Sequence, residues 1–270
     1  MNSILVFLDF SATAILAFDQ ALAIAVLKGA NLNLCHITKD LNESTRSEVS
    51  EKMQPFIEKA KSQNVRADFV IEKGELFETA KLVTSRLKPD LIVVGTHGSE
   101  GIHLRLFGSA IHKLVREVAA TTLVLGTVCT PIVSGFQRVL VPADIQSRYL
   151  HKVSKAADLL APNGEITFLN IENPNLPTED STHANIEIAK KMLDDRKIKW
   201  RAVELKAKPH ETGYAMQTLE YMREEKMEMI AIAAEVSQRF RHFGKIDKET
   251  ILLNEDGFMV LCVNRLIDEV

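Results

Sequence analysis

Cysteine is scarce in this chain of 270 residues, and the few cysteines present are widely separated. Cys35, Cys129 and Cys262 form no C-x2-C pair, and an odd count fits neither a disulfide framework nor a zinc knuckle. We therefore expect free thiols in a reducing compartment, and we interpret the protein as cytoplasmic.

Charge of one sign is not in excess, and long apolar runs are missing. The 33 basic and 36 acidic residues leave a net charge of -3, which excludes the strongly basic class of dedicated nucleic-acid binders. No stretch approaches the roughly 20 apolar residues that span a bilayer. The opening MNSILVFLDF lacks the positive region of a signal peptide. Neither a membrane nor a nucleic acid is therefore expected as a partner.

The familiar catalytic motifs are missing as well. The sequence contains neither a G-x-S-x-G elbow nor a G-x4-G-K-[ST] loop, which argues against a serine hydrolase and a P-loop enzyme. His97, His103 and His112 have no cysteine or carboxylate at ligand spacing, so we assign no metal ligands. No residue stands out as catalytic, and enzymatic activity stays open.

The sequence does contain a regular alternation of short apolar runs and amphipathic helical stretches. The first run, ILVFLDFS, predicts a buried strand and a helix cap, and a helical pattern from Ile15 then ends at Gly29. The alternation continues and predicts five strands with intervening helices in an open, mostly parallel α/β sheet. The later strands are expected at 32–37, 67–72, 91–95 and 121–126, and the later helices at 42–64, around 76–87 and around 111–118.

The second half of the chain repeats this pattern. An offset of 135 places Asp144 on Asp9, and the apolar runs at 166–171, 227–234 and 257–263 match later strands of the first half. The segment at about 127–136 contains Pro131 and Gly135 and is typical of a linker. We therefore predict two domains, residues 1–129 and residues 137–270.

The most informative segment is VVGTHGSEGIHLRLFGSAIHKLV. A buried strand leads into Gly95 and Gly98, nine residues follow, and Gly108 and Ser109 open a helix. Glycine lets main-chain N–H groups approach an anion, and a helix N-terminus adds unpaired donors. The segment therefore favours a phosphate site at the carboxyl end of a parallel strand, although a tight turn and a helix cap would also account for these residues.

These residues resemble the universal stress protein family, whose ATP-binding members carry G-x2-G-x9-G-[S/T] after the fourth strand. The similarity covers essentially the whole first half and also includes Asp9, Ser11 and the GANLNLCHI run. It implies two UspA-like folds, of the adenine nucleotide alpha hydrolase-like class. These would be two tandem five-stranded open sheets with helices on both faces, packed as an intramolecular pseudo-dimer through strands 121–126 and 257–263.

The resemblance also implies the ligand and its contacts. ATP or another adenine nucleotide, with Mg²⁺ or Mn²⁺, would bind in the first half. The aspartate would lie by the nucleoside, the isoleucine main chain by the adenine edge, and the glycines and serine by the phosphates. These positions are Asp9, Ile37, Gly95, Gly98, Gly108 and Ser109.

The second half departs from the family pattern at the corresponding loop. Ala234 and Ser237 stand where two glycines would be, and Glu235 and Asp247 would bring negative charge near a phosphate. The resemblance therefore implies a degenerate second site.

Three functions stay open. The first is a stress-response or regulatory protein that binds ATP and acts through its conformation or an unknown protein partner. The second is an enzyme with phosphoryl chemistry, at most a slow ATPase in our interpretation. The third is an interaction protein that holds no nucleotide. Assembly of two chains into a homodimer is also open.

Overall fold

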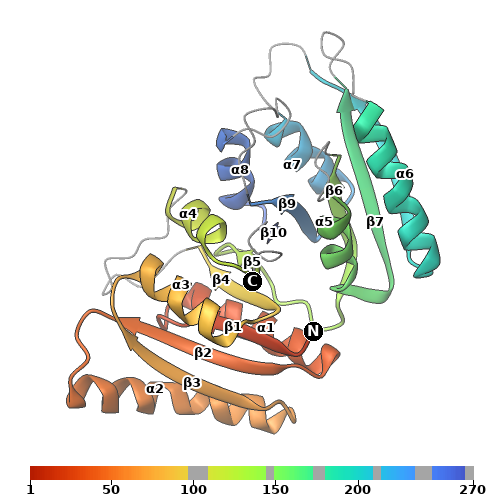
Figure 1. The fold of residues 1–270 in the computed structure, drawn as a ribbon. Coiled ribbons are helices and arrows are strands. Elements are labelled where there is room, and N and C mark those ends of the chain that lie inside the picture. Colours follow the sequence, from red (N-terminus) through yellow and green to blue (C-terminus); the bar gives the residue numbers. More distant parts are fainter. Residues whose placement is uncertain (97–108, 144–148, 173–179, 209–213, 235–244, 265–270) are drawn as a thin grey trace.

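The computed structural model describes residues 1–96, 109–143, 149–172, 180–208, 214–234 and 245–264. Strands and helices alternate in both halves of the chain (Figure 1). The first half contains β1 (Ser3–Phe7), α1 (Ala12–Lys28), β2 (Asn31–Thr38), α2 (Glu43–Ser62), β3 (Ala67–Lys73), α3 (Leu76–Leu87), β4 (Leu91–Gly95), α4 (Ser109–Glu117) and β5 (Thr121–Leu125). The second half contains β6 (Phe136–Pro142), α5 (Tyr149–Ala157), β7 (Leu160–Glu172), α6 (Asp180–Asp195), β8 (Lys199–Lys206), α7 (Ala215–Glu224), β9 (Met229–Ala233), α8 (Lys245–Leu252) and β10 (Met259–Val263).

Local sequence signals set the ends of the first helix. The Ser11 side chain accepts a hydrogen bond from the main-chain N–H of Ala14, which satisfies a donor that the helix leaves unpaired. At the other end Gly29 adopts the left-handed conformation, with φ of 66°, and its N–H bonds the Ala25 carbonyl. The predicted helix start and the glycine stop are both confirmed.

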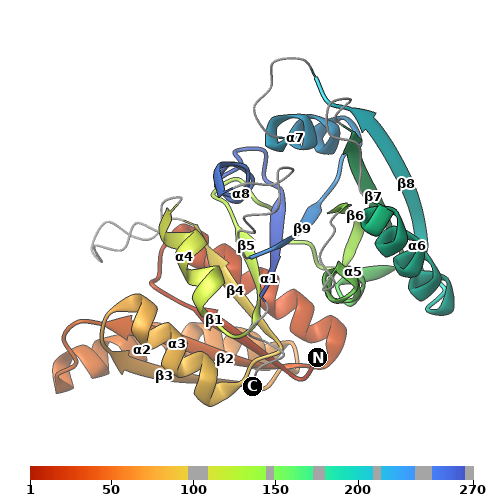
Figure 2. The same cartoon turned by 45° about the horizontal axis from the view of Figure 1, so that its top comes forward.

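The strands form one sheet of ten, in the order β3-β2-β1-β4-β5-β10-β9-β6-β7-β8. Among the described residues, all neighbouring strands are parallel except β5 and β10, which are antiparallel. The two expected five-stranded sheets are therefore present, but joined edge to edge, because main-chain hydrogen bonds between β5 and β10 fuse them. Figure 2 shows the outer strands, β3 and β8, at the two ends of the molecule.

The strand register relates the two halves of the chain residue by residue. Ile4 of β1 lies between Leu32 and Leu91, and Val139 of β6 lies between Ile166 and Met229. Ile4 and Val139 are thus equivalent, at the offset of 135. β4 pairs with β5 in the same register as β9 pairs with β10. β4 is thus equivalent to β9 and β5 to β10, at an offset of 138 residues.

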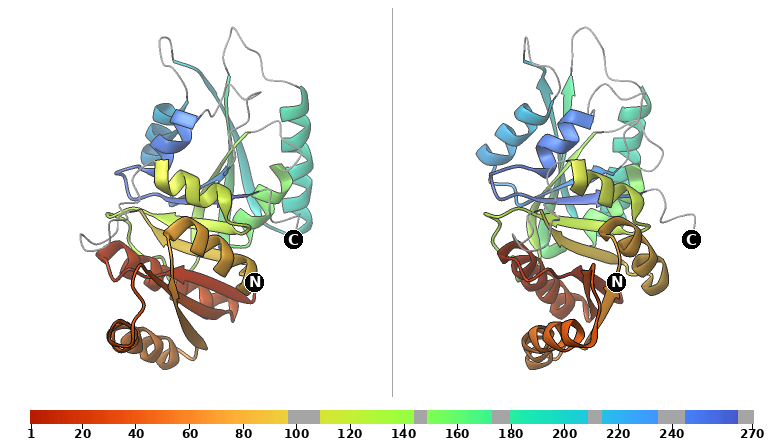
Figure 3. Two further views of the ribbon diagram at one scale, coloured as in Figure 1. Left: turned by 60° about the vertical axis from the view of Figure 1, so that its left-hand side comes forward. Right: turned by 90° about the vertical axis from the view of Figure 1, so that its left-hand side faces the viewer.

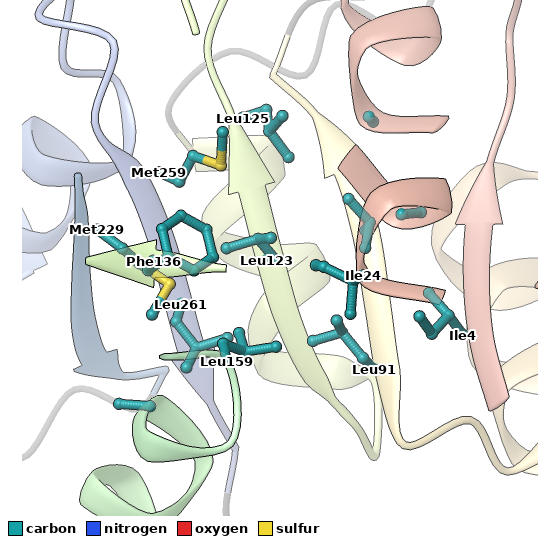
Figure 4. Packing of buried hydrophobic residues seen from close by; sticks show 14 of the residues in the cluster. Ile4, Ile24, Leu91, Leu123, Leu125, Phe136, Leu159, Met229, Met259 and Leu261 are labelled. Atoms are coloured by element: carbon teal, nitrogen blue, oxygen red, sulfur yellow. The ribbon is translucent and has the colours of Figure 1, made fainter. Parts of the chain in front are cut away.

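Buried side chains form a core on each face of the sheet. One core joins the sheet to α1, α2, α5 and α6, and the other joins it to α3, α4, α7 and α8. The first core is continuous between the halves: Leu123 and Leu125 lie beside Met259 and Leu261, with Phe136 next to them (Figure 4). The two halves therefore share their interior.

The connection between the halves is fastened to the first helix. The buried Gln20 side chain bonds Ile132 twice: its Oε1 accepts from the main-chain N–H at 2.7 Å, and its Nε2 donates to the carbonyl at 3.2 Å.

Within the described part of the chain, no helix has the length and apolar character needed to cross a bilayer.

Candidate functional site

The carboxyl ends of β1, β2 and β4 bring three of the predicted site residues to one edge of the sheet. Asp9 follows β1, Ile37 lies near the end of β2, and Gly95 is the last residue of β4. β1 lies between β2 and β4, and the helices that follow β1 and β4, α1 and α4, pack on opposite faces of the sheet. This edge is therefore the topological switch point, the position at which open α/β sheets hold ligands. Gly98 and Gly108 lie outside the described residues; Ser109 begins α4, and its side chain lies outside the description.

Asp9 stands at the turn between β1 and α1. Its Oδ1 accepts a hydrogen bond from the Ser11 N–H at 3.0 Å, and its side chain is only partly buried. The cap of α1 itself is Ser11, whose hydroxyl also lies 3.3 Å from that of Thr13. Asp9 is thus oriented by the turn without being the helix cap.

Ile37 presents its main chain at the same edge. Main-chain groups of successive residues point alternately to the two neighbours of a parallel strand. The Leu8 N–H bonds the Cys35 carbonyl toward β1, and the Thr38 carbonyl accepts from Gly74 on the β3 side. The N–H and carbonyl of Ile37 therefore face the β1 side, at a level where β1 has already ended, while its side chain is buried in the core.

Gly95 is required by packing at the end of β4. A Cβ at this position would lie 2.8 Å from the main-chain carbon, the carbonyl oxygen and the Cβ of Thr13, in the first turn of α1. Real Cβ contacts are not this short, so a side chain here would push α1 and β4 apart. The glycine therefore sets how closely the turn after β4 approaches the turn after β1.

His36 belongs to this site, and sequence reasoning missed it. Its Nδ1 donates to the Leu8 carbonyl at 2.7 Å, because a carbonyl can only accept. Burial lowers the pKa of the imidazole from its ordinary value, which keeps the ring neutral. Phe10, held at a positive φ of 65°, stacks on the ring with centroids 5.0 Å apart. A histidine inside an otherwise apolar strand was the available signal.

The strand register revises the comparison with the second half. Gly95 pairs with Leu125 and Ala233 pairs with Val263, so Ala233, not Ala234, is the equivalent of Gly95. The same register places Asn170 at the position of His36. Ser237 and Glu235 lie outside the described residues.

Two buried charged side chains at this end of the second half hold main-chain groups. Asp247 was expected to bring negative charge near a phosphate; instead its Oδ1 accepts from the N–H groups of Tyr214 and Ala215, at the start of α7. Lys152, 4% exposed, donates to the Pro142 carbonyl at 3.0 Å, at the end of β6. The edge that corresponds to the first-half site therefore carries different chemistry.

Neither metal ligands nor reactive thiols gather in the described part of the chain. No three His, Cys, Asp or Glu side chains come together there as a metal site. The three cysteines are free and buried, and burial raises the pKa of the Cys35 and Cys262 thiols to about 12. The described chemistry of this edge is that of main-chain groups, one carboxylate, the buried imidazole of His36 and closely packed glycine.

Comparison with known proteins gives a family match for the first half of the chain and structural matches for the whole chain. Residues 1–126 match the model of the universal stress protein family. A universal stress protein from Archaeoglobus fulgidus is similar over 98% of this chain and 96% of its own, with a TM-score of 0.72 and 12% identity. A putative universal stress protein from Pseudomonas aeruginosa is similar over 100% of this chain and 96% of its own, with a TM-score of 0.64 and 16% identity.

A universal stress protein in complex with cAMP is similar over 46% of this chain and 94% of its own, with a TM-score of 0.38 and 22% identity. No curated protein sequence matches the chain significantly. The two solved structures that are similar over the whole chain establish a common fold at these identities.

Proposed function

Because residues 1–126 match the model of the universal stress protein family, we propose that the first half binds ATP or another adenine nucleotide. The chain would act in a stress response or its regulation, through its conformation or a contact with a protein partner. The observation that carries the proposal is the meeting of Asp9, the Ile37 main chain and Gly95 at one crevice of the sheet.

Each part of this crevice suits one part of a nucleotide. The Ile37 N–H and carbonyl offer a donor and an acceptor side by side, which complements the edge of adenine. The partly buried carboxylate of Asp9 is placed to accept from hydroxyl groups of a ribose. The close turn at Gly95 leads toward Gly98, Gly108 and Ser109, which we assign to the phosphates.

A divalent cation would accompany the nucleotide. The described residues gather no protein ligand set, so Mg²⁺ or Mn²⁺ would be held chiefly by the phosphate oxygens. Bound there, the cation would neutralise part of the phosphate charge. Asp9 and the main chain of Ile37 would hold the nucleoside independently of the cation.

We assign the protein to binding, with at most slow ATP hydrolysis. Turnover would need a group that positions a water against the γ-phosphate, and the described residues at this edge supply none that is evident. We further propose domains at 1–129 and 137–270, a second domain without nucleotide, and a cytoplasmic location in which the buried thiols stay reduced.

The experiment that tests the proposal measures bound nucleotide. Nucleotide released by denaturing the purified protein is quantified by chromatography, and ATP with Mg²⁺ is then titrated calorimetrically into wild type, Gly98→Asp and Ser237→Asp. We expect about one nucleotide per chain, loss of binding in Gly98→Asp, and wild-type binding in Ser237→Asp, which introduces the same charge in the second half.

Three results would count against this proposal. Two nucleotides per chain would show that the second half also binds. No binding to wild type at millimolar ATP would favour an interaction protein, and many turnovers per site would favour an enzyme.

A further inference from the structure

The helix α4 of the first half is held at its C-terminal end by a residue of the second half. Asn264 follows β10, and its side chain is buried, with 2% of the residue exposed. Its Nδ2 donates to the carbonyls of Val115, Arg116 and Val118, at 2.9, 2.8 and 2.9 Å. These carbonyls are the ones a helix end leaves without partners, so a residue about 146 positions away caps α4.

The arrangement is not repeated on the other side of the pseudo-dimer. The register of β5 and β10 makes Gly126 the equivalent of Asn264, and glycine has no side chain to offer. The corresponding helix α8 is capped from its own half: the Asn254 Nδ2 donates to the carbonyl of Ile251, in the last turn, at 2.9 Å. It also donates to the carbonyl of Phe258, just before β10, at 3.0 Å. Among the described residues, the opposite half thus caps α4 and does not cap α8.

A second contact from the other half supports the middle of α4. Helices α4 and α8 lie side by side (Figure 3), and the buried His112 Nδ1 is 3.7 Å from the Glu249 Oε1. With nine residues, α4 is about 13 Å long. Over so short a rigid element, a shift at one end moves the other end as well.

We propose that Asn264 is a positioning residue for the phosphate end of the first-half nucleotide site. This inference rests on the proposed function, in which Ser109 at the start of α4 meets the phosphates. The second half would then have a role without a ligand of its own: it fixes where α4 begins relative to the turn at Gly95. The nucleoside end, at Asp9 and Ile37, belongs to other elements and would not depend on this contact.

The test separates the two ends of the ligand. ATP with Mg²⁺ and adenosine are titrated into the full chain as wild type, Asn264→Ala and Asn264→Gly, the last of which copies the first-half residue. Amide hydrogen exchange of α4 is followed in each. The matched control is Asn254→Ala, which removes the same side chain from the cap of α8.

In both Asn264 variants we expect the Kd for ATP to rise about tenfold, since the lost hydrogen bonds number more than one, while the Kd for adenosine is unchanged. Exchange should accelerate in α4 and stay slow in β1 and β4. Asn254→Ala should accelerate exchange in α8 and leave the ATP to adenosine affinity ratio at its wild-type value.

Three results would overturn the inference. Wild-type ATP affinity in Asn264→Ala would show that the cap does not position the site. An equal loss for ATP and adenosine would show general destabilisation. Failure of wild type to bind either ligand would remove the proposed function itself, and unchanged α4 exchange in that case would also show that the cap does not hold the helix.

Discussion

Leu123 of β5 pairs with Leu261 of β10 across the antiparallel junction of the sheet, and the strand register makes each the other's equivalent. Both side chains are fully buried in the core that the two halves share. A residue that meets its own equivalent marks the approximate two-fold axis of the pseudo-dimer, which therefore passes between these two leucines.

Substitutions of the two leucines are predicted to have coupled effects on the free energy of unfolding. We expect Leu123→Ala and Leu261→Ala each to lower the free energy of unfolding by about 2–5 kcal/mol, because each leaves a cavity. The double variant should depart from the sum by about 0.5 kcal/mol or more, since the two residues are in contact. Urea unfolding measures all three, with Leu82→Ala, at an exposed position, as the control. Strict additivity would argue against a shared junction.

Gly95 is predicted to tolerate no side chain. In Gly95→Ala the new methyl group would meet Thr13 at 2.8 Å, so we expect a loss of about 1–3 kcal/mol in unfolding free energy. The control is Gly126→Ala, where the nearest atom, the Asn254 carbonyl oxygen, is 3.5 Å away, an ordinary contact. Thermal unfolding of both variants compares them. Equal effects in the two variants would mean that the close approach at Gly95 is not limiting.

His36 predicts a specific pH dependence of stability. Its pKa is lowered in the folded protein by burial, so the unfolded chain takes up the proton first as the pH falls. The contribution of the neutral imidazole to the free energy of unfolding is therefore complete above pH 6.5, the ordinary pKa of histidine. It decreases as the pH falls through the lower pKa of the folded protein. We expect wild type to lose more stability than His36→Asn between pH 7.5 and 5, measured by urea unfolding. The variant carries the residue found at the equivalent position, Asn170.

Parallel curves of unfolding free energy against pH for wild type and His36→Asn would mean that the imidazole has the same pKa in the folded and unfolded states. The other histidines are common to both proteins, so the difference between the curves isolates His36.

Gln20 is predicted to hold the connection between the halves. Gln20→Ala removes both hydrogen bonds to Ile132, and we expect about 1–3 kcal/mol lower unfolding stability together with faster amide exchange in residues 127–135. Gln54→Ala, at an exposed position on α2, is the control and should change stability by less than about 0.5 kcal/mol. Unchanged exchange in the connection would contradict this role.

Most of the strands could be predicted from the sequence because the signals are local. Buried apolar runs ending in a polar turn marked β1 and β4, and the offset between Asp9 and Asp144 agrees with the observed register of Ile4 and Val139. Strand β8, with its alternating exposed and half-buried residues, was not predicted, because an edge strand carries a weak apolar signal.

The features that depend on distant contacts were beyond such reasoning. Nothing near Asn264 in the sequence indicates a helix end at Val115, and the steric role of Gly95 depends on where Thr13 lies in space. The one-residue error at Ala234 has the same origin, since only strand pairing fixes which residue faces which. The assigned contacts of Asp9, Ile37, Gly98, Gly108 and Ser109 with a nucleotide stay predictions.

The antiparallel junction of β5 with β10 has a consequence for how the molecule meets its surroundings. Because strand direction reverses there, the carboxyl ends of the strands in one half open at one margin of the sheet and those of the other half at the opposite margin. In a dimer of two identical subunits joined in this way, the two margins of the sheet would carry the same residues. Any substitution would then occur at both margins. A single chain is free of that constraint, and the two margins of this molecule differ: His36 and Gly95 lie at one, and Asn170 and Ala233 lie at the equivalent positions of the other.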